Sequence, residues 1–235
     1  VGGIVIAAIG EDPLTTYGVM IQQSLFSYDG ILKTLHFASP LILTALAIAV
    51  TFKANVYNMA VEGSAVLGGF FAAVVGFSVT GLSPVAHITL CLAVGVVAGV
   101  VFTIIPALLK AYLNVDEMVV TLMLNYALVI VLQYLAEGVF KDPSSGYVST
   151  YTINNSAMFQ KLFDSNLTSF FFIAIAVFII MYFVFKKSKL GYEITAMGFN
   201  SEFSEAAGMN VRQKIIIIML ISGALSGLAG AGYMM

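Results

Sequence analysis

Apolar residues gather along the chain in long runs that short polar stretches separate. Most runs approach the roughly 20 apolar residues that an α-helix needs to cross the hydrocarbon core of a bilayer. They lack the period-two alternation of membrane barrel strands, and backbone groups in lipid must bond within their own segment, so each run predicts a helix. The seven runs, the first interpreted as the tail of a span, are residues 1–9, 36–52, 58–80, 85–109, 118–136, 170–185 and 215–235.

This pattern predicts an all-α fold, a polytopic integral membrane helical bundle with about seven transmembrane segments. We interpret residues 1–235 as a single transmembrane domain. Both ends of the chain lie inside apolar runs, and residue 1 is not Met. We therefore expect a fragment of a longer chain, truncated at both ends.

Composition supports a bilayer as the solvent of this chain. Hydrophobic residues make up 60% of the 235 residues and charged residues 9%, whereas an average soluble domain carries roughly 25% charged residues. The net charge of -2 provides no basic surface for nucleic acid. A single cysteine, two widely separated histidines and the lack of a nucleophile beside a base predict no metal site and no catalytic residue.

The distribution of Lys and Arg predicts an orientation. If the polar stretch at residues 53–57 faces the cytoplasm, seven of the ten basic residues fall in cytoplasmic connections, which is the bias typical of membrane proteins. Residues 186–214 then form a cytoplasmic loop and residues 137–169 an outer loop. The seven residues are Lys53, Lys110, Lys186, Lys187, Lys189, Arg212 and Lys214.

The two long loops carry distinct patterns. In the cytoplasmic loop, Ser201 can cap a short helix whose first turns hold Glu202 and Glu205, where the helix dipole favours acids, and Gly208 can end it. The alternative is a structured turn between spans. The outer loop is polar and aromatic, and we expect it either to help receive a binding protein or to form a lid over helix ends. Its marked residues are Tyr147, Tyr151, Asn154, Asn155 and Phe159.

The cytoplasmic loop also resembles the coupling segment of ABC importer permeases of the nucleoside and simple-sugar type. The matching motifs are Gly-Tyr-Glu at 191–193, Ala-Met-Gly-Phe-Asn at 196–200 and Glu-Ala-Ala-Gly at 205–208. The family usually has Arg where this chain has Thr195. Three further stretches are similar to the family in the same order, namely the Asn and Glu-Gly signature at 52–63, the segment at 116–126 and the Gly-rich run at 222–231.

The resemblance implies a permease domain in the bacterial inner membrane that moves nucleosides or related simple sugars by ATP-driven alternating access. It also implies a separate ABC ATPase subunit, a second permease subunit of the same family and an extracytoplasmic substrate-binding lipoprotein. The sequence has no P-loop, so the chain is expected to be no enzyme and to carry no cofactor, with ATP and Mg²⁺ on the ATPase. The implied ATPase-coupling residues are Gly198, Asn200, Glu202, Glu205, Ala206, Ala207 and Gly208.

Glu62 is the sharpest candidate for the substrate pathway, because a charge inside a membrane helix costs about 2.5–3.5 kcal/mol. Asn58 precedes it by four residues and would share its face on a helix. Asn125 and Tyr126 lie on another predicted helix and complete a polar patch if the two helices face each other. The alternatives are a structural role for Glu62, amides that join helices, and a packing role for Tyr126.

A different class of function is also compatible with the residues. An ion- or proton-coupled secondary transporter of small polar solutes would use Glu62 as its proton site. Such carriers often show matching pairs of interrupted helices, whereas the sequence shows one interrupted run. Purine nucleosides, pyrimidine nucleosides and sugars are not distinguished as substrates. The motifs Gly95-x-x-x-Gly99 and Gly223-x-x-x-Gly227 predict close packing of helices.

Overall fold

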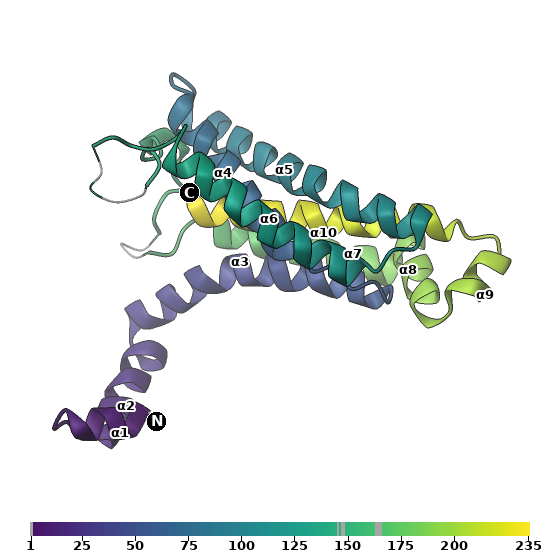
Figure 1. Ribbon diagram of the computed structural model, residues 1–235. Helices are drawn as coiled ribbons and strands as arrows, with labels where there is room; N and C mark the ends of the chain where they lie inside the picture. Colours follow the sequence, from purple (N-terminus) through teal and green to yellow (C-terminus); the bar gives the residue numbers. More distant parts are fainter. Residues whose placement is uncertain (1, 145, 147–148, 163–165) are drawn as a thin grey trace.

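The computed structural model describes residues 2–144, 146, 149–162 and 166–235 (Figure 1). Over these residues the chain is a bundle of α-helices, with isolated bridges as its only extended pairing. The all-helical membrane bundle predicted from the sequence is confirmed. Six helices are long and apolar enough to cross a membrane: α3 (Tyr28–Lys53), α4 (Val61–Ser78), α5 (Pro84–Leu113), α6 (Glu117–Glu137), α7 (Phe170–Lys187) and α10 (Val211–Met234).

The prediction of about seven membrane segments was too high by one for the described residues. The first apolar run forms only α1 (Gly2–Ala8), a helix of seven residues. Such a helix rises about 10 Å, which is a third of the hydrocarbon core. It packs beside α2 (Pro13–Ile21), which continues through the short π-helix η1 (Gln22–Phe26) into α3, and α1 and α2 lie apart from the bundle in Figure 1.

The centre of the bundle is α10, which makes its most extensive contacts with α5, α4 and α3. In the most apolar 18-residue stretch of α10, 61% of the residues are buried, against 17% in the corresponding stretches of α6 and α7. Its glycines allow backbone to touch backbone: a Cβ at Gly227 would overlap the carbonyl oxygen of Gly95, and one at Gly99 would overlap that of Gly223. The predicted packing role of the two Gly-x-x-x-Gly motifs is confirmed.

The ends that the sequence assigned to the cytoplasm lie together at one end of the bundle (Figure 1). Two short helices project there, α8 (Lys189–Phe199) and α9 (Ser201–Ala206). The expected short helix is present, but its cap is Asn200, whose Oδ1 accepts from the N–H of Phe203 at 2.9 Å. Ser201 is instead the first helical residue. Gly208 has a φ of +86° and follows the end of α9, as predicted.

At the opposite end, part of the outer loop is packed over the helix ends. The backbone N–H of Asn154 donates to the carbonyl oxygen of Gly76 at 3.0 Å, and the fully buried ring of His87 is hydrogen-bonded through Nδ1 to Ser156 Oγ at 2.9 Å. Phe159 N–H donates to the carbonyl oxygen of Met235. These are the contacts of a lid, while reception of a binding protein stays a prediction. Tyr147 lies outside the described residues.

Candidate functional site

The connection between α3 and α4, residues 54–60, is not helical and is partly buried in the bundle. We call it the α3–α4 connection. Asn55 has a φ of +58°, in the left-handed region, and turns the chain at its start. The prediction that residues 58–80 form one helix was wrong at its beginning, because α4 starts at Val61. Asn58 therefore does not share a helix face with Glu62.

Three side chains on one face of α6 hold the α3–α4 connection. Glu117 Oε1 accepts from the N–H of Tyr57 at 3.0 Å, and Thr121 Oγ1 accepts from the N–H of Met59 at 3.1 Å. Asn125 Nδ2 donates to the carbonyl oxygen of Met59 at 2.7 Å. Spacings of four residues place these side chains in a row along the helix. We call Glu117, Thr121 and Asn125 the α6 ladder.

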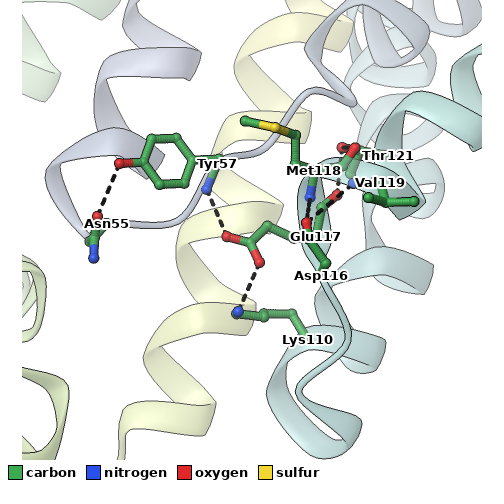
Figure 2. A network of polar contacts seen from close by, with 8 residues as sticks. All are labelled: Asn55, Tyr57, Lys110, Asp116, Glu117, Met118, Val119 and Thr121. Atoms are coloured by element: carbon green, nitrogen blue, oxygen red, sulfur yellow. Dashed lines mark hydrogen bonds and ion pairs between the residues drawn. The ribbon is translucent and has the colours of Figure 1, made fainter.

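The base of the α6 ladder carries an ion pair. Lys110 Nζ, from the last turns of α5, lies 2.8 Å from Glu117 Oε2, so each carboxylate oxygen has a partner (Figure 2). Glu117 is 6% exposed, and a charge at that depth requires such neutralisation. The Asp116 side chain accepts from the N–H groups of Met118 and Val119 and so caps α6.

The four predicted pathway residues fall into two pairs. Asn58 is fully buried, donates through Nδ2 to Ser222 Oγ of α10 at 3.0 Å and accepts through Oδ1 from its neighbour, the N–H of Ala60. Asn58 and Asn125 thus both hold the α3–α4 connection. Glu62, in the first turn of α4, is exposed on this chain, as is Tyr126, which is 73% exposed. The expected patch of all four residues is not formed within this chain.

The loop predicted to couple to an ATPase is anchored at its first helix. A Cβ at Gly198 would overlap the carbonyl oxygen of Lys53, so α8 sits directly on the last turn of α3. Glu193 of α8 forms ion pairs with Lys214 and Lys189, and the hydrogen bond from Lys214 holds the pKa of this carboxyl below its usual value.

The rest of that loop borders a cleft or projects into solvent. The cleft, of about 740 Å³, separates α9 from the ends of α3 and α5. Four of the predicted coupling residues line it, namely Gly198, Asn200, Glu202 and Glu205. The other three, Ala206, Ala207 and Gly208, are exposed at the tip. Two aromatic side chains that sequence reasoning did not single out, Phe199 and Phe203, are also exposed, by 88% and 73%.

Comparison with known proteins decides the family. Residues 30–235 match the sequence model of a family described as the permease component of branched-chain amino acid transport systems. The chain belongs to this permease family. No solved structure matches it.

Among curated relatives, this permease chain is 32% identical to the nucleoside ABC transporter permease protein NupB of Lactococcus lactis subsp. cremoris (strain MG1363), over 99% of the chain and 66% of the relative. It is 36% identical to the guanosine ABC transporter permease protein NupP of Bacillus subtilis (strain 168), over 85% of the chain and 58% of the relative. It is 30% identical to the glucose ABC transporter permease protein TsgB13 of Haloferax volcanii, over 98% and 63%. The resemblance stated from the motifs is confirmed, and the chain spans no more than about two thirds of these relatives.

Two parts of the permease site went unrecognised in the sequence analysis. Glu117 and Thr121 were noted only inside a family-like stretch, and Lys110 only as a basic residue of a loop. A signal was present, since Glu117, Thr121 and Asn125 recur every fourth residue in an otherwise apolar run. A polar row on a membrane helix requires a polar partner. The partner is the backbone of residues 57–59, and a backbone partner cannot be recognised from the side chains in a sequence.

Proposed function

We propose that this chain is the transmembrane subunit of a bacterial ABC importer that translocates nucleosides across the cytoplasmic membrane by ATP-driven alternating access. In this proposal it works with a separate ATPase, a second permease subunit and an extracytoplasmic binding protein. The observation that carries the proposal is the similarity to NupB over 99% of the chain, together with the higher identity to NupP. Related simple sugars are the second substrate class, because TsgB13 is named for glucose.

The exposed pair, Glu62 and Tyr126, is where we place contact with the substrate. Glu62 lies at the start of α4, where the helix dipole stabilises its negative charge. A carboxylate accepts hydrogen bonds from ribose hydroxyls, and a tyrosine ring offers a face on which a base stacks. Asn58 and Asn125 fix the α3–α4 connection, which leads into the first turn of α4 that carries Glu62.

The projecting loop is where we place the ATPase. Gly208 has open space around it but a left-handed backbone, so a side chain there strains the end of α9 without disturbing the bundle. Replacing Gly208 with Leu should leave the membrane fold intact and lower substrate-stimulated ATP hydrolysis. Unchanged hydrolysis in the assembled variant would remove the loop from the coupling interface.

Uptake measurements test the whole proposal. The full-length permease, reconstituted in proteoliposomes with its ATPase, second permease and binding protein, should take up labelled guanosine only when ATP is present on the ATPase side. Unlabelled uridine and glucose, added as competitors, rank the substrate classes. Uptake that follows an imposed proton or sodium gradient without ATP would replace the proposal with the secondary transporter.

Substitution of Glu62 tests the placement of the pathway. Glu62→Gln should slow uptake per folded molecule, and Glu62→Leu should slow it more because it also removes the hydrogen-bond acceptors. Glu11→Gln is the matched control, since Glu11 is an exposed acid outside the bundle. Normal uptake per folded molecule in Glu62→Leu would exclude Glu62 from the pathway.

A further inference from the structure

The α3–α4 connection is held by side chains from α6 and α10, and its beginning is contacted by α8. At residues 57–59 it is held by the α6 ladder, through hydrogen bonds of 2.7–3.1 Å. At its beginning it follows directly on the Lys53 carbonyl, on which Gly198 of α8 is seated. The connection therefore links the projecting loop at one side to the first turn of α4 at the other.

Beyond its first turn, α4 is held in another way. A Cβ at Gly68 would come within 2.6 Å of the carbonyl oxygen of Gly227, so the two backbones are in contact. Packed cores of this kind are stiff. A side-chain hydrogen bond, in contrast, contributes only about 1 kcal/mol net, so one such bond can be exchanged for another when a new partner is offered. Glu62 thus stands at the junction between a stiff helix body and a connection held by exchangeable bonds.

The loop on the other side is attached so that it can act on the connection. The ion pair from Glu193 to Lys214 joins α8 to the start of α10. A cleft separates α9 from the ends of α3 and α5, which leaves α9 room to move relative to the bundle. Gly198 is close to the end of α8 that adjoins α9, so a displacement of α9 that tilts α8 acts on the connection at the Gly198 contact.

We propose that the α6 ladder is the positioning element of transport: Glu117, Thr121 and Asn125 set the α3–α4 connection, and through it Glu62, while α8 displaces that connection through Gly198. The three are positioning residues that act through the backbone of residues 57–59. The transport part of this inference rests on the proposed function, whereas the positional part does not. Lys110 completes the element by fixing Glu117 from α5.

Thiol labelling tests the positional part without any need for transport. A cysteine replaces Glu62 in the full-length permease in nanodiscs, and its rate of reaction with a polar maleimide is measured, Cys91 being fully buried. Thr121→Val should change that rate roughly threefold to tenfold, the population shift that follows loss of one such hydrogen bond. Thr121→Ser should restore it. Thr44→Val is the control, because the Thr44 hydroxyl bonds only carbonyls of its own helix.

Gly198→Ala gives an independent test from the other side of the connection and keeps the inference falsifiable if Thr121→Val folds poorly. It should also change the labelling rate at position 62, although residue 198 lies on α8. Unchanged labelling in folded Thr121→Val and Gly198→Ala would overturn the inference.

The coupling between hydrolysis and uptake tests the transport part, with Glu62 retained. In the reconstituted importer, Thr121→Val should lower the ratio of guanosine taken up to ATP hydrolysed roughly threefold or more, and Thr121→Ser should restore it. If uptake and hydrolysis fell by the same factor, so that their ratio was unchanged, the α6 ladder would have only a structural role and the transport part would be overturned. A wild-type complex without ATP-dependent uptake would refute the proposed function, and the labelling result would still decide the positional part.

Discussion

Helix α4 is attached to the bundle in two contrasting ways. Along its body, glycines bring its backbone against α10, and at Gly68 and Gly230 no atom of a side chain fits between the helices. At its beginning, polar side chains from α6 bond the backbone of the α3–α4 connection, and Ser222 of α10 accepts from its Asn58 side chain. The glycine contact allows only one separation of the two helices, and an added side-chain atom would disrupt it. The second consists of separate bonds that can be removed one at a time, so the two regions should respond to substitution very differently.

The glycine contacts should show the largest effect. Gly230→Ala places a methyl group against the carbonyl oxygen of Ala65 on α4, a backbone atom that cannot move aside. We expect a loss of about 3 kcal/mol in unfolding free energy, at the upper end of the usual cost of overpacking. Thermal unfolding in detergent measures it. Gly18→Ala, in open space on α2, should be neutral, and equal effects at both positions would contradict the contrast.

The ion pair at the base of the ladder should come second. Glu117→Leu leaves Lys110, whose side chain is only 22% exposed, without its partner, and should cost about 2 kcal/mol. Combining it with Lys110→Met should recover part of that loss, because the uncompensated charge is removed. A double variant that is less stable than Glu117→Leu would show that the pair contributes little.

Single hydrogen bonds to α10 should have a smaller effect. Ser222→Ala removes the acceptor of the Asn58 Nδ2 donor and leaves a buried N–H without a partner, at a cost of about 1 kcal/mol. Ser226→Ala provides a matched control one turn away, since the equally buried Ser226 hydroxyl bonds only carbonyls of α10. Similar melting temperatures for the two variants would refute a stabilising hydrogen bond from Asn58 to Ser222.

The smallest effect should belong to the ion pair between Glu193 of α8 and Lys214, because Glu193→Gln keeps a hydrogen-bond acceptor for Lys214. Because Lys214 lowers the pKa of Glu193 in the folded state, the stabilisation is fully present above the ordinary value near 4.5 and is lost as pH falls through the lower folded pKa. The difference in melting temperature between the wild type and Glu193→Gln should therefore be small at pH 7 and shrink below about pH 4.5. If this difference in melting temperature grew on acidification, it would contradict the lowered pKa of Glu193 in the folded state.

The sequence predicted the part of this molecule that depends on hydropathy and local capping. The spans, the small-residue motifs and the turn at Gly208 follow from length, from missing side chains and from backbone preference. The start of α4 did not, because Met59 and Ala60 are as apolar as the helix that follows, and bonds from α6, some sixty residues away, hold residues 57–59 outside the helix. The exposure of Glu62 and Tyr126 could not be predicted either, since it depends on which helix faces are covered.

The same bonds constrain how the protein is made. The Tyr57 N–H finds its acceptor 60 residues later in the chain, and Asn58 finds Ser222 only 164 residues later. When α3 and α4 leave the ribosome they form a hairpin whose connection has unpaired donors, which lipid cannot satisfy. We expect that end of the hairpin to stay beside water or the insertion machinery until α6 and then α10 have been synthesised. The α3–α4 connection is thus completed by side chains that leave the ribosome after it.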